Sequence, residues 1–169
     1  MIITALALKH ETAISDYIAE FSNAGEDRMD GYFGKPEWSH AQTVEKLAAW
    51  ERGKDLDGWV PHTTRFLVDS GRILGNYNLR HALTDKLMLE GGNCGYSVRP
   101  SERRKGHATL MLSHAKGLAR ELGIQRMLLT CKAENIGSSK TIVNNGGILQ
   151  DVIYHEELGV EIARYWIIL

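Results

Sequence analysis

The clearest hydrophobic pattern of the chain lies in its second half. Apolar residues recur there at three- and four-residue steps over four turns, which predicts an amphipathic helix over residues 108–122. The apolar positions are Ala108, Met111, Leu112, Ala115, Leu118, Ala119 and Leu122. Gly123 follows directly, in the position of a C-terminal cap.

Shorter patterns predict the remaining elements. We expect helices at residues 10–23, 41–52 and 137–144, and strands at residues 2–8, 65–69, 72–80, 90–99, 126–131, 148–154 and 161–169. Residues 23–38 are expected to form a loop, with the acidic residues Glu26, Asp27 and Asp30, that either gates the acceptor cleft or is simply solvated. Strands that flank helices on both sides indicate a mixed α+β fold rather than a doubly wound one.

The composition fits one soluble domain over residues 1–169. Hydrophobic residues make up 43% of the chain and charged residues 24%. No apolar run reaches the length of a membrane span, so we expect no membrane partner. Cys94 and Cys131 lie in apolar segments, which favours reduced, buried thiols and a cytoplasmic location.

Charge is distributed unevenly along the chain. The net charge is −1, which argues against a nucleic-acid partner, but residues 99–126 hold seven bases and two acids. Residues 1–60 hold eleven acids and six bases. Ordinary surface charge is one interpretation, and a local site for a compact anion in the second half is the other.

A basic, glycine-containing turn precedes the 108–122 helix: Arg103-Arg104-Lys105-Gly106-His107-Ala108. Backbone N–H groups at a helix start and the helix dipole both favour a phosphate group there. The P-loop pattern and the dinucleotide fingerprint are absent from the chain, and the pattern present is R-x-x-G-x-A.

This turn resembles the cofactor-binding motif of the GNAT superfamily of acyl-CoA-dependent N-acetyltransferases. Asn135 and Gly146 also match the family spacing, and residues 91–100 together with Arg164-Tyr165-Trp166 resemble a branch of predicted bacterial acetyltransferases. The resemblance implies a central, mostly antiparallel sheet of six or seven strands flanked by about four helices. It also allows a homodimer.

The resemblance further implies where acetyl-CoA binds. Backbone groups of Ser97 and Val98 would pair with the pantetheine arm, and residues 104–109 would hold the pyrophosphate. The implied residues are Ser97, Val98, Arg103, Arg104, Lys105, Gly106, His107, Ala108, Thr109, Asn135, Ser138 and Lys140. A solvated basic face is the alternative for Arg104 and Lys105, and a helix N-cap is the alternative for Asn135.

The implied reaction is direct attack of a primary amine, from a small molecule or a peptide, on the acetyl group of acetyl-CoA. Glu90 is the candidate general base, with an exposed carboxylate at a strand end as the alternative, and Asn93 can orient a water. Many family members place a tyrosine acid where this chain has Ile142, so a non-catalytic acyl-CoA-binding module is the alternative. Scattered His and Cys residues lead us to expect no metal. Trp59 can line the acceptor pocket or belong to the core.

Overall fold

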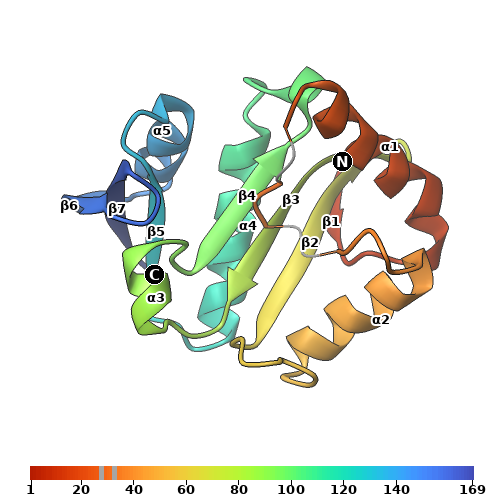
Figure 1. The fold of residues 1–169 in the computed structure, drawn as a ribbon, viewed down its shortest axis with the longest axis horizontal. Coiled ribbons are helices and arrows are strands. Elements are labelled where there is room, and N and C mark those ends of the chain that lie inside the picture. The colour runs from red at the N-terminus through yellow and green to blue at the C-terminus, as the bar shows by residue number, and fades with distance from the viewer. Residues whose placement is uncertain (27–28, 32–33) are drawn as a thin grey trace.

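The computed structural model describes residues 1–26, 29–31 and 34–169. Its strands form two sheets, drawn in Figure 1. The first has the order β1-β2-β3-β4, with β1 (Ile2–Thr4), β2 (His62–Asp69), β3 (Arg72–Arg80) and β4 (Cys94–Val98). The second has the order β5-β7-β6, with β5 (Arg126–Lys132), β6 (Ile148–His155) and β7 (Val160–Ile168). Neighbouring strands within each sheet are antiparallel.

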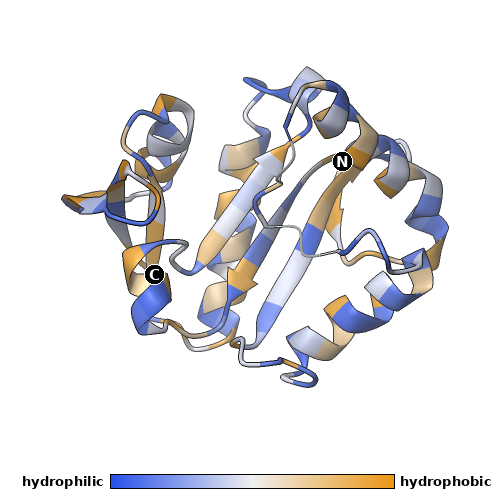
Figure 2. Ribbon diagram, viewed as in Figure 1, coloured by the Kyte–Doolittle hydropathy of each residue, from blue (hydrophilic) through white to orange (hydrophobic). Residues whose placement is uncertain are grey.

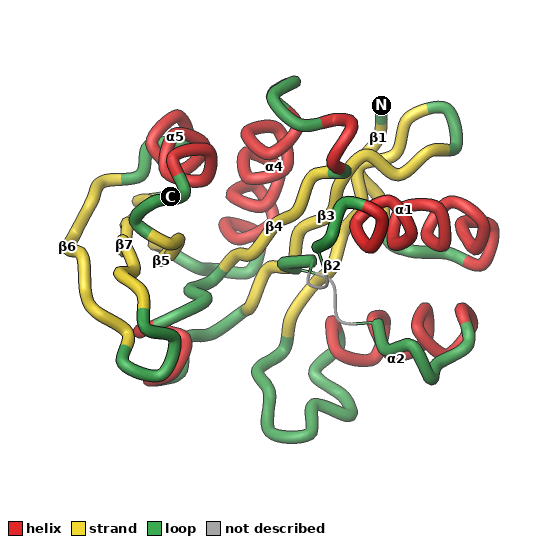
Figure 3. The backbone as a smooth tube through the Cα atoms, turned by 45° about the horizontal axis from the view of Figure 1, so that its top comes forward, coloured by secondary structure: helices red, strands yellow, loops and turns green. Residues whose placement is uncertain are grey.

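Helices cover both faces of the first sheet. The helices are α1 (Glu11–Asn23), α2 (His40–Glu51), α3 (Asp85–Leu89), α4 (His107–Glu121) and α5 (Ile136–Asn144), with short 3-10 turns at η1 (Leu8–His10) and η2 (Pro100–Glu102). Figures 1 and 3 show α4 on one side of the first sheet and α1 with α2 on the other. The expected α+β class and the mostly antiparallel sheet are confirmed.

Two buried clusters hold these layers together. The larger cluster joins the apolar side of α4, including Met111 and Leu112, to β3, β4, the second sheet and Ile142 of α5. The smaller one packs α1 and α2 against the opposite face of β2 and β3, around Tyr17 and Phe66. Figure 2 shows hydrophobic and hydrophilic residues mixed along α1, α2 and α4, as amphipathic helices require.

The two sheets meet at Asn93. Its backbone N–H donates to the carbonyl of Leu128 at 2.7 Å, and its Oδ1 accepts from the Leu128 N–H at 2.8 Å. Its Nδ2 also donates to the carbonyl of Arg80. The Asn93 side chain is buried and joins β3 to β5, so the expectation that it orients a catalytic water is wrong. Beyond this point no hydrogen-bonded ladder links β4 with β5 in the described part of the chain.

Two predicted strands are shorter in the structure. The strand expected at residues 2–8 ends at Thr4, and the one expected at 90–99 begins at Cys94. A short helix, α3, precedes this second strand. Thr84 is its N-cap, because the Thr84 hydroxyl accepts a hydrogen bond from the Leu87 N–H. Gly91 and Gly92 then adopt φ values of +98° and +56°, which no strand accommodates. The prediction that Glu90 opens the central strand is therefore wrong.

Among the described residues, no helix combines the length and the apolar character that a membrane span requires.

Candidate active site

The start of α4 presents unsatisfied backbone donors. Gly106 is its N-cap, with φ +83° and ψ 0°, and no side chain of the described residues caps it. The N–H groups of His107, Ala108 and Thr109 lie in the first turn, where a helix supplies no acceptor. Arg104 also adopts a left-handed φ of +64°. This turn can receive an anion without first displacing a side-chain cap.

Two of the three cations of the turn are already engaged. The Arg103 guanidinium donates to both carboxylate oxygens of Glu26, at 2.7 and 2.8 Å, which raises the pKa of Arg103. The Lys105 ammonium lies 2.8 Å from Glu102 Oε2, and hydrogen bonds from Lys105 and Arg72 lower the pKa of Glu102 to about 2. Arg104 is exposed and forms no ion pair with the described residues. Arg104 is therefore the cation of the turn most available to a phosphate.

His107 is buried at the first position of α4, and its Nε2 lies 3.7 Å from Glu102 Oε2. The His107 side chain therefore faces Glu102, which also pairs with Arg72 and Lys105.

In the register of β4, the backbone groups of Ser97 and Val98 point to opposite edges of the strand. Hydrogen bonds from Arg80 N–H to Asn93 O and from Arg99 N–H to Leu74 O bracket the β3–β4 ladder. Hydrogen-bonded pairs alternate along an antiparallel ladder. Ser97 therefore bonds to Asn76 on β3, while Tyr96 and Val98 turn their backbone groups toward β5.

The start of α5 faces this strand. Asn135 caps α5, because its Oδ1 accepts from the Ser138 N–H at 3.0 Å. The Ser138 hydroxyl lies 2.8 Å from the Tyr96 hydroxyl, which joins α5 to β4. Lys140 is exposed on α5. Ile142 is fully buried in the core. The cap expected as the alternative role of Asn135 is therefore present.

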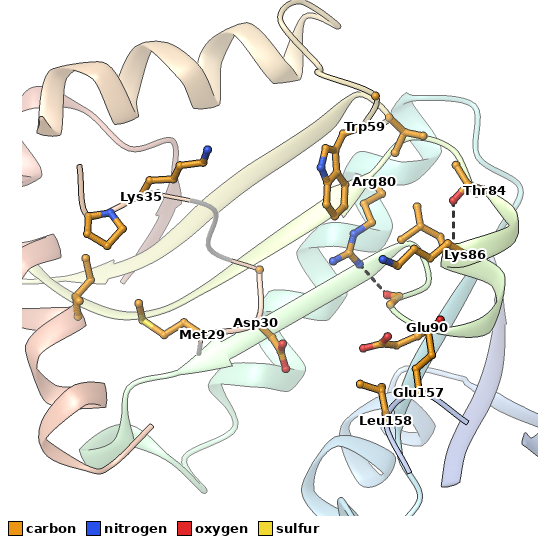
Figure 4. A pocket seen from close by; sticks show the side chains of 18 of the residues that line it. Met29, Asp30, Lys35, Trp59, Arg80, Thr84, Lys86, Glu90, Glu157 and Leu158 are labelled. Carbon is orange, nitrogen blue, oxygen red and sulfur yellow. Dashed lines mark hydrogen bonds between the residues drawn. The ribbon is translucent and has the colours of Figure 1, made fainter. Parts of the chain in front are cut away.

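A cavity of about 1020 Å³ opens on the face of the first sheet that carries α1, opposite α4. Figure 4 shows side chains around it from the loop after α1, the segment before β2, the end of β3, α3 and the β6–β7 turn. Glu90, the residue that ends α3, lines the cavity, and its Oε2 lies 3.7 Å from Nε2 of His155 at the end of β6. Glu90 is thus placed where it can meet a ligand.

The tryptophans and the acidic residues of the 23–38 loop have different positions relative to the cavity. Trp59 is 50% exposed and lines the cavity, whereas the rings of Trp38 and Trp50 pack against each other at 5.8 Å. Asp30 also lines the cavity, and Asp27 lies outside the described residues. Glu26 pairs with Arg103 at the α4 turn instead.

The candidate cofactor residues and Glu90 are not brought into one pocket. Of the twelve candidates, none is among the described residues that line the cavity. Arg80, which lines the cavity, contacts β4, the strand that carries Ser97 and Val98. A Cβ added to Gly95 would lie 3.5 Å from Nη2 of Arg80, so this guanidinium lies against β4 on the cavity side. Tyr96 contacts α5 on the other side.

Sequence reasoning missed Arg80 and Lys86. Arg80 lies in a strand pattern and Lys86 in a short helix that was not predicted, and both line the cavity. The only available signal was a cation in each segment.

Neither cysteine is suited to carry an acyl group. Both are buried. Burial raises the pKa of the Cys94 thiol to about 12 and also raises that of Cys131, so both stay protonated and weakly nucleophilic.

Solved acetyltransferases share this fold. RimL, a ribosomal L7/L12 alpha-N-protein acetyltransferase in complex with coenzyme A, has a TM-score of 0.72 at 15% identity, over 99% of this chain and 93% of that one. A ribosomal-protein-S5-alanine acetyltransferase from Vibrio fischeri has a TM-score of 0.70 at 11% identity, covering 98% and 91%. The protein yncA from Salmonella typhimurium, with acetyl-CoA, has a TM-score of 0.63 at 16% identity, covering 99% and 93%.

No curated protein matches the sequence significantly. The sequence does match one family, described as the acetyltransferase (GNAT) domain, over residues 8–148. Because this match spans most of the chain, the chain belongs to the GNAT family and is an N-acetyltransferase.

Proposed function

We propose that this enzyme transfers the acetyl group of acetyl-CoA to a primary amine by direct attack. The observation that carries the proposal is the uncapped start of α4 behind the left-handed residues Arg104 and Gly106. A pyrophosphate there would accept hydrogen bonds from the first-turn N–H groups and gain from the helix dipole.

The remaining donor contacts follow from the register of β4. Tyr96 and Val98 direct backbone groups toward β5, so an extended pantetheine arm would pair with them as an added strand. The Val98 N–H would then stabilise the oxyanion of the tetrahedral intermediate. On the other side of this path lies the start of α5, with Asn135, Ser138 and Lys140. Ser97 contributes less to binding of the pantetheine arm, because its backbone is already hydrogen-bonded to β3.

On the acceptor side, Glu90 is the proposed general base. It lines the cavity, and a carboxylate can take the proton that the ammonium group must lose before attack. The two buried, protonated thiols support direct transfer rather than a covalent acyl-enzyme.

A pair of glycine variants tests the donor site. Gly106 and Gly123 lie at opposite ends of α4, with φ of +83° and +76°, and a Cβ at either would meet no atom within 4 Å. Both substitutions therefore carry a similar backbone strain. Calorimetric titration with acetyl-CoA should show at least about a tenfold weaker affinity for Gly106→Trp, because the indole occupies the space of the pyrophosphate.

Gly123→Trp should bind acetyl-CoA as the native chain does. Equal affinities for the two variants would mean that the α4 turn does not hold the cofactor.

A further inference from the structure

Charged side chains of both signs line the cavity. Lys86 and Glu90 lie one helical turn apart, a spacing at which a lysine and a glutamate commonly pair. No ion pair joins them, and the Lys86 ammonium has no partner among the described residues. In Figure 4 both side chains point into the cavity. A ligand between them would meet a cation and an anion at once.

Arg80 strengthens the cationic part of the cavity. It is 8% exposed, and its Nη1 donates to the carbonyls of Gly91 at 2.7 Å and Gly92 at 3.2 Å. These bonds hold the guanidinium over Gly95 of β4, beside the path proposed for the acetyl group. Three cations, Lys35, Arg80 and Lys86, line this one cavity and favour a ligand that brings an anionic group.

The acidic part of the cavity comes from three separate segments. Asp30 belongs to the loop after α1, Glu90 ends α3, and Glu157 lies in the β6–β7 turn. Glu90 is further held by His155, 3.7 Å away. These carboxylates favour an ammonium group next to Glu90, the proposed base.

An apolar wall completes the cavity. Trp59 is half exposed there, with Leu87 and Leu158 also in the lining. The volume of about 1020 Å³ exceeds what a simple alkylamine fills.

We propose that the acceptor is a free α-amino acid with an apolar or aromatic side chain. Its ammonium meets Glu90, its carboxylate meets Lys86 beside Arg80, and its side chain packs against Trp59. This inference rests on the proposed function and names the substrate class of the same site.

The amine loses two protons and gains the acetyl group. The ammonium gives one proton to Glu90, and the neutral nitrogen attacks the acetyl carbonyl carbon. The C–S bond breaks, and the sulfur leaves with the bonding electrons. The nitrogen then loses a second proton. Of the two protons released from the amine, one ends on the CoA sulfur and the other passes to solvent. The products are an N-acetyl amino acid and CoA.

Matched amines test the class. L-Leucine and isopentylamine differ by the carboxylate alone, and L-phenylalanine and phenylethylamine form a second pair. With acetyl-CoA and the native chain, kcat/KM should be at least about tenfold higher for each amino acid, as one charge-assisted contact supplies. Leucine amide, putrescine and a leucine-initiated tripeptide complete the panel.

Lys86→Gln should lower kcat/KM for L-leucine about tenfold, mainly through KM, and change that for isopentylamine less than about twofold. Lys46→Gln, on α2 and paired with Asp55 at 3.7 Å, is the control and should change neither. Glu90→Gln should lower kcat for both amines.

Equal rates for leucine and isopentylamine, or a preference for the tripeptide or putrescine, would overturn the amino-acid assignment and leave N-acetyl transfer standing. An equal loss for both amines in Lys86→Gln would overturn it as well. Absence of turnover with every amine would contradict the proposed function itself.

Discussion

Individual glycines in this chain serve different purposes, and their surroundings separate them. Gly92 and Gly106 both adopt left-handed φ, of +56° and +83°. A Cβ on Gly92 would lie 2.3 Å from the Leu128 carbonyl oxygen, while a Cβ on Gly106 meets no atom within 4 Å. Gly92 thus permits the junction of β4 with β5, and Gly106 leaves space for a ligand.

Alanine substitution should separate these roles. Gly106→Ala should reduce the free energy of unfolding by about 1–2 kcal/mol, the usual strain of an L-residue in this region. Gly92→Ala adds a backbone clash and should reduce it by about 2 kcal/mol more, or prevent folding. Urea denaturation compares them, and equal losses would mean that the Asn93 junction tolerates displacement.

At the scale of secondary-structure elements, one carboxylate ties α1 to the segment that leads into the α4 turn. Glu20 accepts from the Ser101 N–H at 2.8 Å and from the buried Arg99 guanidinium at 2.7 Å. Burial of the carboxyl opposes its ionisation, but these hydrogen bonds outweigh burial and lower the pKa of Glu20 to about 2 from an ordinary 4.5. The charged form is therefore favoured in the folded state.

This tie predicts a pH-dependent contribution to stability. A depressed pKa stabilises the fold above pH 4.5, and that stabilisation disappears as pH falls toward 2. Glu20→Gln should therefore lower the free energy of unfolding by about 1–2 kcal/mol at pH 7, after allowance for solvent screening. Denaturation between pH 7 and pH 2 measures the difference, which should shrink as pH falls.

Asp16→Asn, on the exposed side of α1, is the matched control and should show little difference at any pH. A constant gap between Glu20→Gln and the native chain would contradict a role for the Glu20 charge.

At the scale of the whole molecule, the two halves of the site differ in how far the sequence reveals them. The α4 turn is contiguous, and its glycine, its cations and the helix pattern after it lie within one short segment. Periodicity also predicts α4 well, because its buried positions repeat locally, and the bounds expected for β3 and β7 agree with the structure to within one residue. The mixed α+β class follows from the order of these elements.

The acceptor cavity could not be predicted in this way. Its walls come from segments between Ile18 and Leu158 that only the fold brings together. The five-residue helix α3 is too short for a periodic pattern, so nothing in the sequence placed the Lys86 cation at the cavity, and Glu90 was assigned to a strand. Likewise, the pairing of Arg103 with Glu26 depends on contact between distant segments.

The reaction of acetyl-CoA with an amine at this site can be tested in a single assay. Release of CoA thiol is followed together with formation of the acetylated amine, for the native chain and Glu90→Gln. We expect equal amounts of the two products, and a kcat at least about a hundredfold lower for Glu90→Gln. Thiol release without an acetylated amine, or tight acetyl-CoA binding with no turnover on any amine, would contradict it.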